Sequence, residues 1–161
     1  MPIAFLHSPA QIIQQVLIDL AAGTDPTPWE DEEAAIALGS VAAWPVFSVG
    51  EPSRPDNVIT IYDTSPQSDG SSMVDGETWF HYGFQVMVRT TLHKNGFVKA
   101  NYIHKALDED VYNTVVTLTE PDVQYLIQSI SGTLPLVLGK ETPSSKRDLF
   151  TINALATLRR F

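Results

Sequence analysis

The sequence predicts an α+β fold, in which a small mixed, mainly antiparallel β-sheet carries two helices on one face and a long projecting β-hairpin. Two segments repeat their apolar residues at helical spacing, and a third alternates apolar and polar residues over 15 positions. The expected element order is α, β, β, β, α, β, β, β. The 161 residues suffice for one hydrophobic core, so we expect a single domain over residues 1–161.

The first helix has a recognisable start and end. Ser8 can accept a hydrogen bond from the backbone amide of Gln11, whose side chain can reach back to the cap, and Pro9 suits the first helical position. Apolar residues then follow at helical spacing: Ile12, Ile13, Val16, Leu17 and Leu20. Gly23 ends the run. Residues 24–33, with four consecutive acids, predict a loop, and residues 34–38 predict a short turn of helix.

The next strands are expected to be short. Residues 43–47 predict a strand or the approach to one, and Pro52 then keeps the chain extended. Residues 58–62 are β-branched and aromatic, which favours a strand. Residues 63–76 are polar and rich in serine and glycine, and they predict a long exposed loop at the tip of a hairpin.

Residues 78–92 are the most informative segment. One face would carry Phe80, Tyr82, Phe84, Val86 and Val88, and the other would carry Trp79, His81, Gln85, Met87 and Arg89. Fifteen residues at about 3.3 Å each would span roughly 50 Å, about three times the usual strand length. Paired with residues 58–62, this strand is expected to project as an arm whose outer half needs a neighbouring subunit to cover it.

The second half of the chain predicts one helix and three strands. The helix is expected to begin at Asn95 and to end near Leu107, because the acids at 108–110 oppose the macrodipole at a helix C-terminus. The strands are expected over residues 114–119, 123–130 and 149–158. The two helices are expected to pack on the same face of the sheet.

Charge is unevenly distributed along the chain, whose formal net charge is −9. Residues 1–53 contain seven acids and no Lys or Arg, whereas the residues from Gly139 onward contain five bases and two acids. An acidic surface repels nucleic-acid phosphates, which disfavours a protein that reads DNA sequence. The asymmetry could let copies bind head to tail, or it could serve only solubility.

The composition excludes several kinds of site. The chain has no cysteine, so it has no disulfide scaffold, zinc ribbon, iron–sulfur centre or thiol nucleophile. No pair of histidines has the spacing of a zinc site, and the acidic runs 30–33 and 108–110 lack a calcium loop. Residues 132–142 do not match a phosphate loop. We therefore expect no catalytic residue, metal or cofactor, and a soluble, unexported protein with no membrane span.

The chain from Trp44 onward resembles a protein family in the order and spacing of its motifs. The motifs are residues 44–47 (WPVF), 51–52, 55–56, 59–64 (ITIYDT), Gly76, 83–89 (GFQVMVR), 96–99, Ile103, Leu107, 124–125, Gly139 and 147–153 (RDLFTIN). In these motifs it resembles the tail terminator, or tail completion, proteins of tailed bacteriophages, which are also labelled minor capsid proteins. The acidic residues 25–33 belong to no part of this resemblance.

The resemblance implies a structural protein of the virion. Such proteins form a hexameric ring on the last ring of the tail tube, stop its polymerisation and present a docking surface to the neck and head-completion proteins. The implied place is the head-proximal end of the tail, after synthesis in the host cytoplasm. DNA would pass through the lumen without specific binding, and an acidic lumen would favour its passage.

Two sets of residues are candidates for contacts in such a ring. The subunit interface is expected to use the less apolar face of the long strand, namely Trp79, His81, Gln85, Met87 and Arg89, with the loop 63–76. On this hypothesis Arg89→Glu weakens the ring and leaves the monomer fold intact; alternatively, Trp79 and Met87 pack within their own chain. Lys140, Lys146 and Arg147 are expected to dock on an acidic tube or neck surface, or are simply solvated.

Two other functions remain open from the sequence. The nearer one is a different ring of the same neck, such as a head-completion or adaptor protein. The more distant one is a small-molecule-binding α+β domain, which would need a deep pocket with convergent polar groups.

Overall fold

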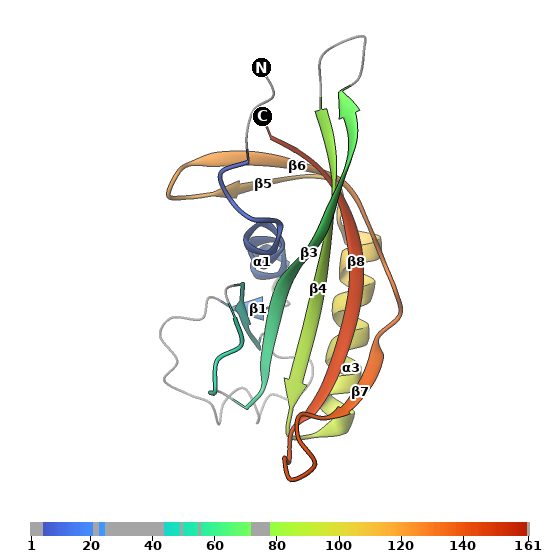
Figure 1. Cartoon of the computed structure of the whole chain (residues 1–161). Helices are drawn as coiled ribbons and strands as arrows, with labels where there is room; N and C mark the ends of the chain where they lie inside the picture. The colour runs from blue at the N-terminus through green and yellow to red at the C-terminus, as the bar shows by residue number, and fades with distance from the viewer. Residues whose placement is uncertain are drawn as a thin grey trace.

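The computed structural model describes residues 5–20, 23–24, 44–48, 50–54, 56–71 and 78–160 (Figure 1). Its elements are, in chain order, α1 (Pro9–Asp19), β1 (Gly23–Thr24), β2 (Trp44–Phe47), β3 (Val58–Ser71), β4 (Thr78–Thr90), α3 (His93–Lys105), the π-helical turn η2 (Ala106–Asp110), β5 (Tyr112–Leu118), β6 (Val123–Gly132), β7 (Leu136–Lys140) and β8 (Asp148–Arg160). The α+β class is confirmed.

A single sheet organises these elements. Its strand order is β1-β2-β3-β4-β8-β6-β5, and β7 pairs with β8 outside this path. The pairs β1–β2 and β2–β3 are parallel and all other pairs are antiparallel. β6 and β7 follow the same edge of β8 one after the other, β6 along residues 154–160 and β7 along residues 148–151.

The hydrophobic core lies between one face of this sheet and the helices α1 and α3. The alternation predicted for β4 and β8 is confirmed, because Phe84, Val86 and Val88 are buried opposite Ala154, Ile152 and Phe150. One continuous cluster joins these residues to the inward faces of both helices. The expectation of two helices on one face is therefore correct, and the opposite face of the sheet is left without a helix.

The start of α1 is fixed by the predicted capping box. The Ser8 hydroxyl accepts from the Gln11 amide at 3.3 Å, and the Gln11 side chain accepts from the Ser8 amide at 2.8 Å. A carboxylate oxygen of Asp63 in β3 also accepts from the amide of Ala10 at 2.7 Å. A negative charge at a helix N-terminus is favourable, so Asp63 ties α1 to the sheet.

The outer half of the long strand is more fully covered than the sequence predicted. β8 pairs with β4 from Phe80 to Thr90, so only Thr78 and Trp79 of β4 extend beyond it. The ring of Phe5 packs at 5.2, 5.1 and 5.3 Å from the rings of Phe80, Tyr82 and Tyr125. The chain's own Phe5 therefore covers part of the surface for which the sequence predicted a neighbouring subunit.

Several element boundaries also differ from the expectations. β3 runs to Ser71, so residues 63–71 of the predicted loop are strand; the rest of that loop, residues 72–76, lies outside the described residues. The second helix continues as η2 to Asp110 instead of ending near Leu107, because the buried side chains of Ala106 and Leu107 still face the core. β1 and β7 were not predicted, and residues 25–43, with the acidic loop and the short helical turn, lie outside the described residues.

Lys99 is the unusual residue of the core. Its side chain is fully buried on the inward face of α3, with the ammonium nitrogen 5.4 Å from the ring centre of Trp44 and 5.6 Å from that of Tyr102. Aromatic faces attract the cation, but they do not replace its hydration shell. Burial consequently lowers the pKa of Lys99 from 10.5 to about 8.

This burial predicts a pH-dependent stability. Between pH 8 and pH 10.5 the unfolded chain holds a proton on Lys99 that the folded chain has released, so stability rises with pH there. From about pH 7.5 to pH 9.5 we expect a gain of about 1 to 2 kcal/mol in the free energy of unfolding. Burial raises the pKa of Tyr62 and Tyr82 above 10.0, so these groups titrate above that range. Urea denaturation at several pH values should show the rise, and Lys99→Met should abolish it; an equal rise in the variant would contradict this assignment.

Candidate assembly surfaces

The residues predicted for the subunit interface lie on the helix-free face of the sheet. His81 Nδ1 is 2.9 Å from the hydroxyl of Thr157 in β8, and the Gln85 amide donates to Asn153 at 3.1 Å. The guanidinium of Arg159 lies 5.1 Å from the ring centre of Trp79. Trp79, His81, Gln85 and Met87 are all partly exposed. Four of the five predicted residues therefore share an accessible face, and three of them are already held by cross-strand contacts.

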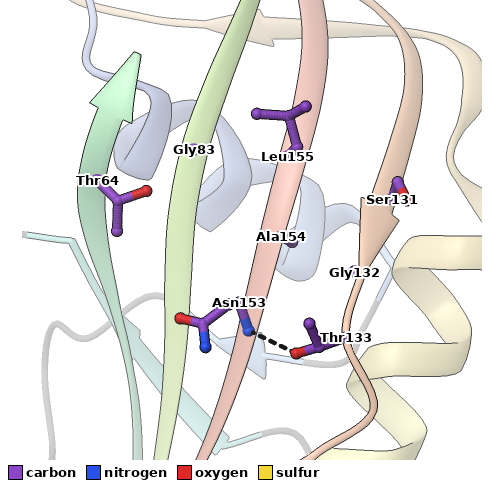
Figure 2. Close-up of a pocket in the computed structure, with 8 residues that line it drawn as sticks. All are labelled: Thr64, Gly83, Ser131, Gly132, Thr133, Asn153, Ala154 and Leu155. Atoms are coloured by element: carbon purple, nitrogen blue, oxygen red, sulfur yellow. Dashed lines mark hydrogen bonds between the residues drawn. The ribbon is translucent and has the colours of Figure 1, made fainter. Parts of the chain in front are cut away.

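A shallow hollow of about 460 Å³ lies on the same face (Figure 2). It is lined by Thr64, Gly83, Ser131, Gly132, Thr133, Asn153, Ala154 and Leu155. It forms where the chain leaves β6 before β7, since the amide of Thr133 donates to the Asn153 carbonyl at 2.8 Å and its hydroxyl accepts from the Asn153 amide at 3.2 Å. Its lining is small and uncharged, so it offers a contact surface and no convergent charged groups for chemistry.

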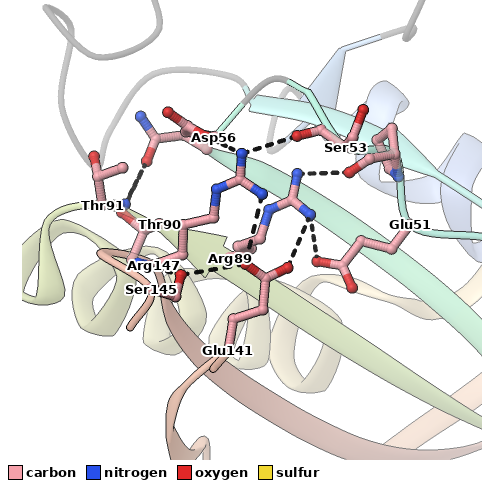
Figure 3. A network of polar contacts seen from close by, with 11 residues as sticks. Glu51, Ser53, Asp56, Arg89, Thr90, Thr91, Glu141, Ser145 and Arg147 are labelled. Carbon is pink, nitrogen blue, oxygen red and sulfur yellow. Dashed lines mark hydrogen bonds and ion pairs between the residues drawn. The ribbon is translucent and has the colours of Figure 1, made fainter. Parts of the chain in front are cut away.

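Arg89, the fifth predicted interface residue, belongs to the interior. Its side chain is 2% exposed, and its guanidinium binds Glu51 at 2.8 Å and the Pro52 carbonyl at 2.7 Å (Figure 3). A second carboxylate, that of Glu141, lies at 3.6 Å. This burial argues against the expectation that Arg89→Glu leaves the monomer fold intact, because a carboxylate there would face Glu51 and Glu141. In the sequence, Arg89 falls on the polar side of the alternation, which predicts an exposed side chain. In the structure, the segments 50–54 and 141–147 cover this side chain.

The three residues predicted to dock on the tube or neck differ in their exposure and in the ion pairs that they form within the chain. Arg147 forms ion pairs with Asp56 and with Glu141, and donates to the Ser53 carbonyl at 2.9 Å (Figure 3). Lys140 binds Asp148 at 3.0 Å but remains half exposed, and His93 approaches the same carboxylate at 3.4 Å. Lys146 is exposed. Arg147 is thus mainly structural, and Lys140 and Lys146 present positive charge to solvent.

Sequence reasoning missed a set of exposed apolar side chains on and beside α3 and β7. Of twelve exposed large hydrophobic residues in the described part of the chain, eight lie on α3, on β7 or beside them. We call this the α3–β7 surface: Leu92, Phe97, Val98, Tyr102, Leu134, Leu136, Val137 and Leu138. Figure 1 shows β7 running alongside α3. The signal in the sequence was the apolar run 134–138, which lacks the charged residues that usually protect an edge strand.

Isolated exposed apolar side chains need no explanation, whereas groups of them commonly mark contacts with other macromolecules. The side chains of the α3–β7 surface do not share one face. Phe97 lies near Phe150 of β8, with 6.4 Å between the ring centroids, whereas Tyr102 lies on the flank of α3 where Lys99 approaches Trp44. In β7, Val137 pairs with Phe150 on the helix side of the sheet, and Leu136 pairs with Thr151 on the helix-free side.

The described residues contain no group of three or more His, Cys, Asp or Glu side chains that could hold a metal ion. Within the same residues, no helix is long and apolar enough to cross a membrane.

The comparisons with known proteins give little additional information. No protein family matches the chain, and no curated protein matches it. Among solved structures, it is similar to a chain in the virion of a native gene transfer agent particle, with a TM-score of 0.44 and 9% identity. The alignment covers 94% of this chain and 95% of that chain. A similarity at this level assigns neither a family nor a function.

Proposed function

We propose that the chain is a structural virion protein, a bacteriophage tail terminator that forms a hexameric ring on the tail tube. In this role it stops tube polymerisation and provides the docking surface for neck and head-completion proteins. The observation that carries an assembly role is the α3–β7 surface, because an isolated domain would leave these apolar side chains in water. The tail terminator assignment is supported by the resemblance of residues 44–153.

Two surfaces have separate roles in this proposal. Trp79, His81, Gln85 and Met87 contribute to a subunit contact across the helix-free sheet face, where they are partly exposed. Lys140 and Lys146 dock on an acidic surface of the tube or neck. The DNA passes through the lumen without specific binding, and an acidic lumen would favour its passage.

A capture experiment distinguishes this proposal from a ring elsewhere in the neck. The tagged chain is incubated with purified tail tubes, and separately with purified portal and head-completion proteins from the same phage. We expect binding to the tube end, with one ring per tube in negative-stain micrographs. Binding to the portal or adaptor without binding to the tube would favour the head-completion alternative.

The docking residues supply a matched pair of variants for the same assay. Lys146→Glu should weaken tube or neck binding, because it reverses an exposed charge. Lys105→Glu is the control, since Lys105 is an exposed lysine at the C-terminal end of α3. Equal binding by the two variants would argue against docking through Lys146.

A further inference from the structure

We propose that the outer edge of β7 receives an extended segment of the terminal tail-tube subunit, which pairs with this edge as an added strand. The segment is apolar and carries an acidic residue at the end that lies beside Lys140. Added strands of this kind gain affinity from backbone hydrogen bonds and specificity from alternate side chains. The inference rests on the proposed function, because it names the contact through which the ring meets the tube.

β7 is apolar and exposed on both of its faces. Val137 pairs with Phe150, whose side chain is buried in the core, so Val137 lies on the helix side of the sheet. Leu136 pairs with Thr151 and lies on the helix-free side. Val137 is 44% exposed and Leu136 is 58% exposed. A partner on one face of the sheet would cover only one of them, whereas a strand beside β7 places side chains over both.

The outer edge of β7 is open in the described part of the chain, where no strand pairs with it. Residues 123–139 contain no Asp, Glu, Lys or Arg, so β7 lacks the charges that usually protect an edge strand. The edge is also short, because Pro135 precedes it and a register shift between Val137 and Gly139 interrupts it. It is therefore suited to one short added strand.

Positive charge lies at one end of this edge. Lys140 is the last residue of β7 and is half exposed, and Lys146 is exposed in the turn from β7 to β8. Residues 140–148 contain three bases and two acids, and both acids are held in ion pairs within the chain. An acidic residue of the docked segment is attracted to this end, and the uncharged residues before β7 offer no such attraction. The charge therefore sets the direction of the segment.

The tube end is the source of the segment that fits the proposed function. A chain that stops polymerisation has to occupy a contact that the next tube subunit would have used. An open strand edge can occupy this contact without offering it again, because β8 already pairs with the other edge of β7. The contact also leaves the proposed subunit interface uncovered, because β8 separates β7 from β4, which carries the residues of that interface.

Three matched variants test the strand contact in a tube-binding assay. Leu136→Asn and Val137→Asn each remove an exposed apolar side chain from one face of β7. Val115→Asn is the control, because Val115 is a similarly exposed valine in the edge strand β5. We expect each β7 variant to bind purified tail tubes about 10-fold more weakly than the unmodified chain, and the control to bind as the unmodified chain does. Circular dichroism checks that all three proteins fold.

Hydrogen exchange tests whether the backbone of β7 is paired in the bound state. Exchange at residues 136–138 should slow at least about 10-fold when the unmodified chain is bound to tubes. Unchanged exchange there, or weaker binding by only one of the two β7 variants, would overturn the strand contact and leave the proposed function standing. Slower exchange with purified neck proteins and not with tubes would overturn the tube as the source of the segment. A chain that binds neither would contradict the proposed function and this inference together.

Discussion

Replacing Arg89 by methionine is expected to lower the free energy of unfolding by about 3 kcal/mol. The arginine is 2% exposed and binds Glu51 at 2.8 Å and the Pro52 carbonyl at 2.7 Å, so its removal leaves these groups without their donor. Glu141 would lose a partner as well. The segments 50–54 and 141–147 should then separate from β4, and hydrogen exchange should rise in both.

The matched control for Arg89→Met is Arg54→Met, which removes an exposed arginine from the segment 50–54. We expect the control to change stability by less than about 0.5 kcal/mol. Arg89→Lys should give an intermediate loss, because one ammonium cannot reproduce the fork of the guanidinium. Urea denaturation of the three proteins measures these differences, and equal stability of Arg89→Met and Arg54→Met would refute the structural role.

Replacing Gly96 by valine is expected to cost about 2 to 3 kcal/mol of stability. A Cβ atom at this position would lie 2.3 Å from Thr90 Cγ2 and 2.6 Å from Phe150 Cε2. Both neighbours are fully buried, so α3 would have to move away from β4 and β8. The glycine is therefore required by the close approach of the helix to the sheet, and the near-UV circular dichroism of Phe150 and its neighbours should weaken in the variant.

The control for Gly96→Val is Lys94→Val, which places the same side chain on an exposed position of α3. It should cost only the helix propensity of valine, a few tenths of a kcal/mol. Thermal unfolding followed at 222 nm separates the two cases. A melting temperature of Gly96→Val within about 2 °C of the control would show that the helix accommodates the added atoms.

Local patterns predicted much of this fold. The capping box of Ser8 and Gln11 depends only on residues three apart, and it was predicted correctly. The alternation in β4 and β8 identified their buried faces, because each strand presents a single face to the helices. These two strands and α1 position most of the core, which explains why the fold class could be predicted from the sequence.

The remaining features depend on contacts between distant segments. Arg89 has the same position in the alternation as Gln85 and Met87, and only the segments 50–54 and 141–147 make it a buried residue. The long arm was assigned to a neighbour because nothing local indicated that Phe5 would cover Phe80 and Tyr82. β7 was missed because a strand of five residues beside Pro135 carries little periodic signal.

The candidate site was predicted in part. The sequence indicated an accessible face with His81 and Gln85, and this face is free of helices in the structure. It did not indicate the exposed apolar side chains of α3 and β7, such as Phe97 and Val137, because β7 is positioned by its pairing with the distant strand β8.

The length of tail tubes made without this protein tests the tail terminator proposal most directly. Tails would be purified from cells infected with a phage whose copy of this gene carries an early stop codon, and would be measured by electron microscopy. The proposal predicts tubes of uncontrolled length that do not join heads, and normal tails when the unmodified gene is supplied from a plasmid. Finished tails of normal length, attached to filled heads, would contradict it.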